Sequence, residues 1–173
     1  MKKKIPFIII GAVLLQGLLI FGCVKFLQLY GPQSVKENVQ TLGNMSYTVP
    51  NGYVETTVQD RDVTYVNGSF VITCNLFTKS YFMEVATTME DKEHFAKFIM
   101  DMNPSYSFSE ISEEDDYVYF SFEGISNNKS YSKMAAVFED NGDFYFIQVE
   151  CPTSNEYMLE DTFEDFVDTV SFN

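Results

Sequence analysis

The chain has 173 residues, of which 46% are hydrophobic and 16% aromatic, and its net charge is −14. Four of its 11 basic residues lie at or before Lys25, whereas all 25 acidic residues follow residue 31. This acidity argues against nucleic acid or anionic lipid as a partner of the later part, because both bind basic surfaces. About 140 residues follow the first 30, enough for one domain with its own core.

The first 30 residues are expected to anchor the chain in a membrane. Lys2, Lys3 and Lys4 precede an apolar run from Ile5 to Val24. At about 1.5 Å per helical residue, this run spans roughly 30 Å, the thickness of the hydrocarbon core. The lysines predict that the N-terminus stays in the cytoplasm and that residues 31–173 lie outside it. The sequence therefore predicts a single-pass protein of the cell membrane, held by an uncleaved signal anchor.

Two other interpretations of this stretch stay open. Ile20–Cys23 resembles a bacterial lipobox, which would make Cys23 a lipidated residue, although Phe21 occupies a place that small residues usually take. A cleaved signal peptide would have an apolar core of about 7–15 residues and an A-x-A-like exit, and neither is found here. All three interpretations place residues 31–173 outside the cytoplasm.

A short linker, residues 31–44, is expected to lead into one extracytoplasmic domain, residues 45–173. Gly31 and Pro32 end the anchor helix, and the residues up to 44 are polar. The next segment, Met45–Tyr53, reads as a short strand that stops at a Pro-Asn-Gly turn. Asn67-Gly68 then separates two strand-like runs and predicts a hairpin, because Asn-Gly is a strong hairpin signal. These runs are residues 63–66 and 69–77.

Two helices are expected, one in the middle of the domain and one near its end. The first covers residues 88–102, with Thr88 as its N-cap and an apolar stripe at helical spacing. The stripe consists of Phe95, Phe98, Ile99 and Met102. The second opens with the capping box Thr153–Glu156 and has one apolar side. That side consists of Leu159, Phe163, Phe166 and Val170.

Four strand-like runs lie between the two helices. They are residues 106–111, 117–124, 131–139 and 143–151, with a hairpin turn at Asp140–Gly142. The order of strands, helix, strands and helix is typical of an α+β fold rather than of alternating βαβ units. We therefore expect an antiparallel β-sheet of about six to seven strands with two main helices, preceded by one transmembrane helix.

Two of these strands are apolar on both faces. Residues Tyr145, Ile147, Val149 and Cys151 share one face of their strand, and Val118, Phe120 and Phe122 share one face of another, so both faces are expected in the core. The opposite faces carry Tyr117, Tyr119, Phe144 and Phe146. A sheet that is apolar on both faces is normally covered on both, here by one helix each. The alternative is an uncovered aromatic strip that binds a peptide or an apolar ligand.

The side of the last helix that faces away from the core is acidic. It carries Asp161, Glu164, Asp165 and Asp168, and no Lys or Arg follows Lys133. This side is a candidate binding surface for a basic protein partner. The alternative is that the acids only keep the domain soluble.

Cys74 and Cys151 are candidates for a disulfide. Both lie in strong strands, on faces expected in the core, and in a domain expected where disulfides persist. A bridge also requires the two Cα atoms to come within about 7 Å. The alternative is two separate buried thiols that pack as small apolar side chains.

The order of these motifs resembles that of the PsbP-like fold. The resemblance covers about residues 45–172 and rests on Val49–Tyr53, on the strand Tyr145–Pro152 with the helix that follows it, and on Val170–Phe172. The family includes an extrinsic photosystem subunit, a nuclear-transport factor and bacterial envelope proteins. The resemblance implies an α/β/α sandwich and mostly non-enzymatic, protein-binding roles, and it carries over no functional residue.

No catalytic constellation emerges from the sequence. His94 is the only histidine, and it has no cysteine or acid at i+4 with which to chelate a metal, so no catalytic residue, cofactor or metal site is predicted. We therefore expect a membrane-anchored extracytoplasmic binding or adaptor module for a protein partner, and no enzyme. The alternative is a small-ligand carrier or an enzyme of the cell envelope with an unrecognised site.

Overall fold

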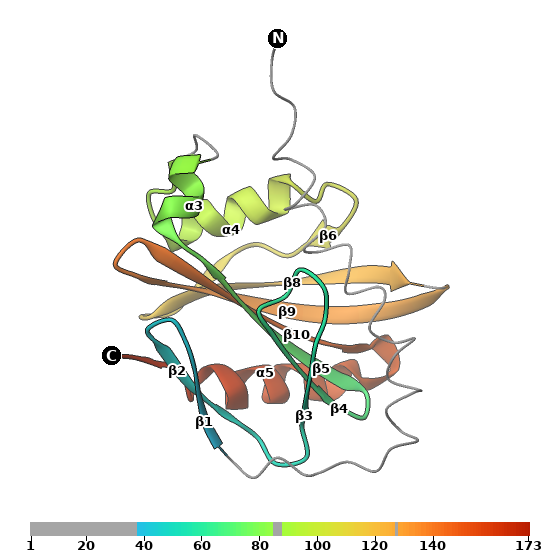
Figure 1. The fold of residues 1–173 in the computed structure, drawn as a ribbon. Helices are drawn as coiled ribbons and strands as arrows, with labels where there is room; N and C mark the ends of the chain where they lie inside the picture. Colours follow the sequence, from blue (N-terminus) through green and yellow to red (C-terminus); the bar gives the residue numbers. More distant parts are fainter. Residues whose placement is uncertain (1–37, 85–87, 127) are drawn as a thin grey trace.

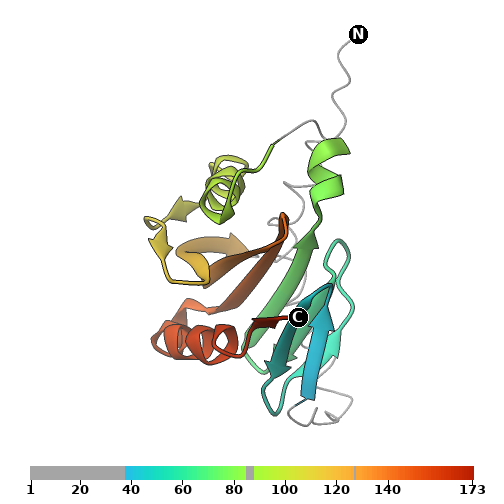
Figure 2. The ribbon, with the colours of Figure 1, turned by 90° about the vertical axis from the view of Figure 1, so that its left-hand side faces the viewer.

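An eight-stranded antiparallel sheet lies at the centre of the structure, a computed structural model that describes residues 38–84, 88–126 and 128–173. Helices α3 and α4 lie on one face of this sheet (Figure 1). Helix α5 and a small three-stranded sheet lie on the other face, as the perpendicular view in Figure 2 shows. This layered α+β arrangement agrees with the fold class predicted from the sequence.

The main sheet has the strand order β3-β4-β5-β10-β9-β8-β6, and β7 also pairs with β8. Its strands are β3 (Val54–Thr56), β4 (Val63–Asn67), β5 (Phe70–Phe77), β6 (Ser107–Phe108), β7 (Ser112–Glu113), β8 (Tyr117–Ser126), β9 (Lys129–Asp140) and β10 (Asp143–Pro152). The β9–β10 turn contains Asn141 and Gly142 with φ of 55° and 84°. Positive φ at both central residues matches the right-handed twist of a hairpin, and Asn-Gly adopts it readily.

The small sheet and the helices complete the two outer layers. The small sheet has the order β1-β2-β11, with β1 (Asn38–Leu42), β2 (Met45–Val49) and β11 (Ser171–Phe172). The helices are α3 (Lys79–Glu84), α4 (Lys92–Asp101) and α5 (Leu159–Val167), and the 3-10 helix η2 (Thr153–Met158) leads into α5. The chain thus brings β2 and β11, from its two ends, together beside α5.

The main sheet has one hydrophobic cluster on each face. The cluster under α5 contains Tyr145 and Phe138, and the cluster under α4 contains Phe144 and Phe146. In the register of the sheet, Tyr117 pairs with Phe138, which pairs with Tyr145. Directly paired residues point to the same face, so Tyr117 lies on the α5 face. The expectation that two helices cover opposite faces is therefore confirmed.

The same register shows that the aromatic strip suggested by the sequence is wrong. Phe144 and Phe146 are buried under α4, 1% and 0% exposed. Tyr117 and Tyr119 lie on the opposite face, half-buried against the α5 cluster. The four rings cannot form one surface, because the pairing of β8 with β9 puts Tyr117 and Tyr119 on one face of the sheet and Phe144 and Phe146 lie on the other.

The cysteine pair behaves as two separate thiols. Cys74 and Cys151 point into the same cluster, as the sequence indicated, and both are free and fully buried. Cys74 pairs with Ile147 on the neighbouring strand. Cys151 lies four residues beyond Ile147, which at about 3.3 Å per residue is roughly 13 Å, too far for a disulfide. The predicted bridge is therefore wrong, although β5 and β10 are neighbours.

The main sheet has eight strands rather than six or seven, and three short elements differ from expectation. Residues 38–42, expected in the linker, form β1, and their pairing with β2 is visible only in the fold. Helix α3 was not expected. The weak strand 106–111 is split into β6 and β7, because between them Ser109 takes over the bonding to β8.

Both main helices begin later in the chain than the sequence indicates. Helix α4 begins at Lys92, and its N-cap is Asp91, whose Oδ1 accepts a hydrogen bond of 2.7 Å from the backbone N–H of His94. Asp caps a helix better than Thr, which explains why Thr88 is bypassed. Thr153 is the first residue of η2 rather than a helix cap, and its Oγ1 accepts a hydrogen bond from the Ser132 hydroxyl at 3.3 Å. The chain forms η2 there, and α5 begins at Leu159.

The predicted membrane anchor, with Cys23, lies outside the described residues. Within the described part of the chain, no helix is long and apolar enough to cross a membrane.

Candidate functional site

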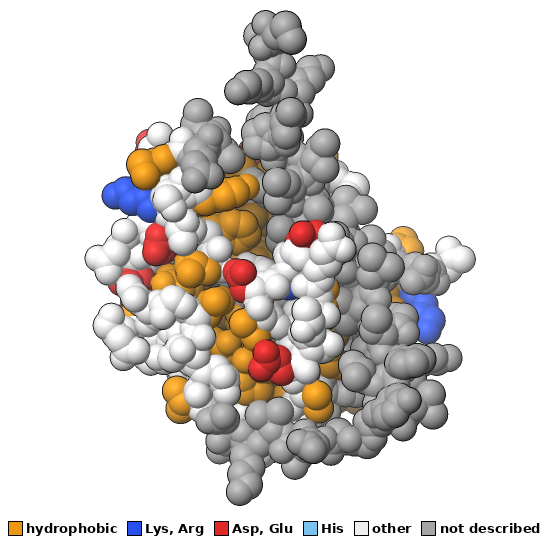
Figure 3. All heavy atoms as spheres, in the orientation of Figure 1, with side chains coloured by type: hydrophobic (Ala, Val, Ile, Leu, Met, Phe, Trp, Pro, Cys, Tyr) orange, Lys and Arg blue, Asp and Glu red, His pale blue; other side chains and the backbone are white. Residues whose placement is uncertain are grey.

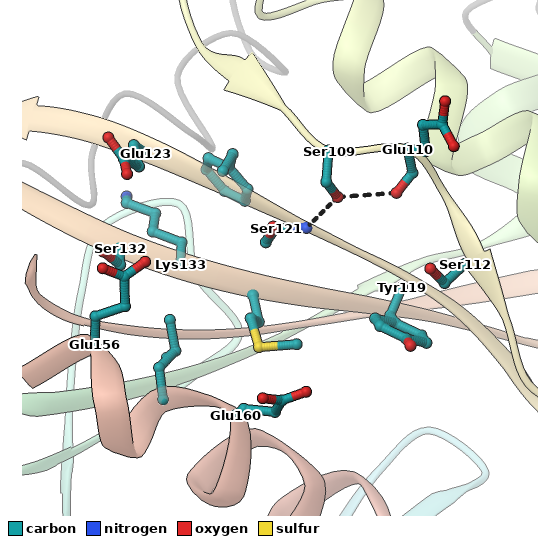
Figure 4. Close-up of a pocket in the computed structure, with 13 residues that line it drawn as sticks. Ser109, Glu110, Ser112, Tyr119, Ser121, Glu123, Ser132, Lys133, Glu156 and Glu160 are labelled. Atoms are coloured by element: carbon teal, nitrogen blue, oxygen red, sulfur yellow. Dashed lines mark hydrogen bonds between the residues drawn. The ribbon is translucent and has the colours of Figure 1, made fainter.

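A groove of about 610 Å³ runs between the start of α5 and the β8 edge of the main sheet (Figure 4). We call it the acidic groove. Its apolar lining includes Tyr119, Met134 and Leu159. The polar side chains around it are serines and glutamates from four segments of the chain. They are Ser109, Glu110, Ser112, Ser121, Glu123, Ser132, Glu156 and Glu160.

The strand side of the groove is shaped by a local exchange of hydrogen bonds at Ser109. The backbone N–H of Ser109 donates to the carbonyl of Ser121, and the N–H of Ser121 donates to the Ser109 hydroxyl, both at 2.9 Å. The Ser109 hydroxyl in turn donates to the carbonyl of Glu110 at 2.8 Å. A side chain thus takes the place of a backbone partner between β6 and β7. The segment holds Glu110 and Ser112 along the groove (Figure 4).

The helical side of the groove comes from the junction of η2 and α5. Leu159, the first residue of α5, is 4% exposed and anchors the helix in the core. Glu156 and Glu160 are exposed on the two sides of Leu159 in sequence, one helical turn apart. Glu156 comes from η2 and Glu160 from the first turn of α5, and both line the groove. In Figure 4 both residues come from the helical segment that faces β8.

The electrostatic character of the groove is negative. Lys133 is its only basic lining residue among those the structure describes, and its Nζ lies 2.8 Å from Glu150 in a buried ion pair. In Figure 4 the Lys133 side chain extends away from the helical side. The four glutamates therefore line the groove without a free cation among its described lining residues. Figure 3 views the molecule from the side of β3 and β4, away from the groove, and there acidic side chains lie across the middle and the most prominent basic ones toward the sides.

Aromatic rings continue the groove along the flank of α5. The rings of Tyr119 and Phe163 lie 6.1 Å apart, and those of Tyr117 and Tyr119 lie 6.0 Å apart. The pKa of Tyr117 is raised, first by burial and then by carboxylates that include Asp168 and Glu164.

The structure distributes the four predicted acids of the last helix over two stripes. Asp161, Glu164, Asp165 and Asp168 are all exposed. Glu164 and Asp168 follow Glu160 at steps of four, so they extend the stripe that borders the groove. Asp161 and Asp165 form the next stripe round the helix. The sequence prediction thus found one part of an acidic surface that continues onto the strands.

Sequence reasoning missed the groove itself. Glu110 and Glu123 come from an edge segment and from β8, and only the pairing of β8 with the chain before it brings them opposite Glu156 and Glu160. The available signal was the spacing of Glu156, Glu160, Glu164 and Asp168, which recur every four residues. The sequence pattern instead predicts that Glu156 belongs to a capping box.

Large apolar side chains are exposed beside the acids. Tyr157 is 80% exposed and Met158 43% exposed, both in η2 directly after Glu156. Exposed aromatic residues next to a groove are typical anchors of protein interfaces. Among residues 38–84, 88–126 and 128–173, no group of three or more His, Cys, Asp or Glu side chains is arranged to hold a metal ion.

Comparison with known proteins identifies the fold but no functional site. No protein-family model matches the chain, and no curated protein matches it in sequence. The structure is similar to cyanobacterial PsbP (CyanoP) from Synechocystis sp. PCC 6803, with a TM-score of 0.53 and 14% identity, over 83% of this chain and 95% of that one. It is also similar to the Ran-binding protein Mog1p of Saccharomyces cerevisiae, with a TM-score of 0.51 and 11% identity, over 79% and 96%.

The chain therefore has a PsbP-like fold, as its sequence motifs indicated. At these identities the likeness concerns the fold alone, and function has to be argued from the site.

Proposed function

We propose that this chain is a membrane-anchored, extracytoplasmic and non-catalytic module that binds a basic segment of a protein partner in the acidic groove. The observation that carries the proposal is the composition of the groove. Four glutamates from three segments of the chain line about 610 Å³ of space, and the one basic lining residue among those described is paired with Glu150.

The apolar lining of the groove suits lysine or arginine side chains. Their methylene stems can pack on Tyr119, Met134 and Leu159 while the charged ends reach the glutamates at the rim. The serine hydroxyls can accept hydrogen bonds from the same charged groups or from the partner's backbone. Tyr157, exposed beside Glu156, offers an aromatic contact at the end of the groove.

The comparison with Mog1p supports a protein as the partner. That protein is described as Ran-binding, and it has the same fold at 11% identity. The groove also offers carboxylates and hydroxyls rather than a nucleophile with its base, since Cys74 and Cys151 are buried in the core. Both points favour binding over catalysis.

Titration with a synthetic peptide of alternating Lys and Ala tests the groove. The 173-residue chain in detergent should bind this peptide, and a peptide of alternating Glu and Ala should not bind. The double variant Glu156→Lys/Glu160→Lys should weaken binding about tenfold and flatten its salt dependence, because two exposed attractions become repulsions.

A matched control changes the net charge by the same amount far from the groove. Glu55 on β3, at the opposite edge of the sheet, and Asp101 on α4 are both exposed. The double variant Glu55→Lys/Asp101→Lys should bind the Lys-Ala peptide nearly as tightly as the unchanged chain. Equal weakening by both double variants would assign the binding to net charge and contradict a defined groove.

The proposed membrane attachment rests on Lys2–Lys4 and on the apolar run Ile5–Val24. Protease added to intact cells should digest the domain, because it lies outside the cytoplasm in this proposal. Protection until the membrane is broken would show the opposite topology. The intact mass of the purified protein separates an uncleaved anchor from a chain that starts at an acylated Cys23.

A further inference from the structure

The α4 face of the main sheet is apolar beneath α4 and polar beyond it. On β10, Phe144 and Phe146 pack in the α4 cluster, and the next two residues on this face are Gln148 and Glu150. In the register of the sheet, Gln148 pairs with Thr73 of β5 and Glu150 pairs with Lys133 of β9. These four side chains are buried, each at most 4% exposed.

The loop between β3 and β4 brings an arginine to this polar part of the sheet. Val58 of the loop packs on Val66 and Val71, and Val71 pairs with Glu150 across the strands. Asp62 fixes the end of the loop, because its Oδ2 accepts a hydrogen bond of 2.7 Å from the backbone N–H of Leu76. Between these two attachments lies Arg61, whose Nε and Nη1 are buried. Burial lowers the pKa of Arg61 to about 10, and Glu150 is the acid that most opposes this shift.

The polar cluster consists of Arg61, Thr64, Asn75, Lys133, Gln148 and Glu150, and its hydrogen bonding is incomplete. The Oε2 of Glu150 accepts from Lys133 Nζ at 2.8 Å and from Gln148 Nε2 at 3.0 Å. Its Oε1, the Oε1 of Gln148, and the Nε and Nη1 of Arg61 are buried without a partner in the described part of the chain. Thr64 Oγ1 and Asn75 Nδ2 are also buried without a hydrogen-bond partner there.

This concentration of unpartnered atoms is unusual for a folded protein. Most buried polar groups are hydrogen-bonded, since a group that is buried without a partner loses its hydrogen bonds to water and gains none in return. The six unpartnered buried side-chain atoms found in the described residues all belong to this cluster, on one face of the sheet. Arg61 forms no ion pair with an acidic side chain of residues 38–84, 88–126 or 128–173. Such a cluster has the composition of a site that a ligand completes.

We propose that the polar cluster binds a small anionic ligand that also carries hydroxyl or amine groups. The adjacent Nε and Nη1 of Arg61 form a pair of donors that fits two oxygens of one carboxylate or phosphate. Glu150 Oε1 and Gln148 Oε1 accept hydrogen bonds from the ligand's donors. An anion without donors would leave these two acceptors unpaired, and a cation would be repelled by Arg61.

Space for the rest of such a ligand adjoins the cluster at Tyr106. A Cβ atom at Gly124 would lie 3.0 Å from the Tyr106 ring and 3.7 Å from Lys133 Cε, so the missing side chain lets the ring lie against β8 beside the cluster. Tyr106 also lines a hollow of about 480 Å³ that contains the hydroxyls of Ser105, Ser107 and Ser130. The hollow shares Glu123 with the acidic groove, but the unpartnered atoms of the cluster belong to residues that do not line that groove.

The test is an NMR titration of the nitrogen-labelled 173-residue chain in detergent with hydroxyacetate, acetate and inorganic phosphate. The Arg61 Nε–H and Gln148 side-chain amide signals should shift and saturate with hydroxyacetate, and at lower concentrations than with acetate, which has no donor for Glu150. The variant Arg61→Gln should raise the half-saturating concentration about tenfold or more, because it removes a charge-assisted pair of hydrogen bonds. Lys97→Gln, which removes an exposed positive charge from α4, should leave it unchanged.

Tighter binding of phosphate than of hydroxyacetate, with the same loss in Arg61→Gln, would support the proposal and identify the anionic group as phosphate. If Arg61→Gln does not fold, Arg61→Lys replaces it, and it should also weaken binding because lysine lacks the paired donors. The proposal is overturned if none of the three probes saturates the two signals, or if the Arg61 and Lys97 variants bind equally well. Water would then complete the cluster.

Discussion

Three tyrosines carry their hydroxyl groups into the core on the α5 side of the sheet. Tyr47, Tyr53 and Tyr65 are 1%, 4% and 2% exposed. The hydroxyls of Tyr47 and Tyr65 lie 3.2 Å apart and form a hydrogen bond in which either can be the donor. Burial raises the pKa of Tyr53 and of Tyr65 from 10.0 to about 12. The folded domain therefore keeps these protons at a pH at which the unfolded chain loses them.

This difference makes the domain sensitive to alkali. Because the folded pKa is raised, the stabilisation is complete below pH 10 and is lost as the pH rises from about 10 to about 12. In that interval each tyrosine should lower the free energy of unfolding by about 1.4 kcal/mol per pH unit. Chemical unfolding of Tyr53→Phe over this range should show a correspondingly shallower slope. An unchanged slope would show that Tyr53 titrates in the folded chain as it does when unfolded.

A substitution at Phe146 tests whether this residue belongs to the core or to an exposed binding surface. It is fully buried under α4. Phe146→Ala should therefore lower the free energy of unfolding by about 3–5 kcal/mol, from lost burial and the cavity left behind. Ile125→Ala, at a side chain that is 74% exposed, is the control and should change stability little. A small loss of unfolding free energy in Phe146→Ala would instead support the exposed aromatic strip.

At the scale of the elements, local signals in the sequence located the long strands, the hairpins and the two main helices. Asn67-Gly68 and Asp140–Gly142 mark turns by local backbone chemistry, so they can be recognised without the fold. β1 pairs with β2, and β8 with β9, through two-residue turns, with Leu42 opposite Met45 and Ser126 opposite Lys129. A shift of one residue at such a turn moves every side chain of the strand to the other face of the sheet. For this reason the sequence could show that two strands are apolar on both faces, but not which face of β8 joins which face of β10.

The same distinction explains what could be known of the candidate sites. The acids of α5 follow from helical periodicity, which is local. Glu110 and Glu123 join them only through the topology of the sheet edge. Arg61 stands in a loop between two strands, and nothing in its neighbours in sequence indicates that its Nε and Nη1 are buried.

The start of α4 allows a test of which residue caps the helix, Asp91 or Thr88. Asp91→Ala should lower the free energy of unfolding by about 1 kcal/mol, because the N–H of His94 loses its acceptor. Thr88→Ala, at the cap that the sequence suggested, should have little effect, since α4 begins at Lys92. Urea unfolding of both variants measures the difference. A larger loss for Thr88→Ala would place the start of the helix where the sequence indicated.

At the scale of the whole molecule, the central sheet separates two candidate surfaces. The acidic groove opens along α5 and the β8 edge, whereas the polar cluster lies on the α4 face. Lys133 on β9 links the two, because it lines the groove and its ammonium group pairs with Glu150 in the cluster. In the two proposals, the groove binds a basic partner and the cluster binds an anionic ligand, and the shared Lys133 predicts that a change at one site affects the other.

The acidic groove is tested most directly by photo-crosslinking in intact membranes. A photoreactive residue placed at Glu160 should crosslink to a protein partner through a segment rich in Lys and Arg, and Glu156→Lys in the same chain should reduce the yield. The same residue placed at Glu55, at the far edge of the sheet, should give little crosslinking. Equal yields from the two positions, or crosslinked segments without basic residues, would contradict the proposed function.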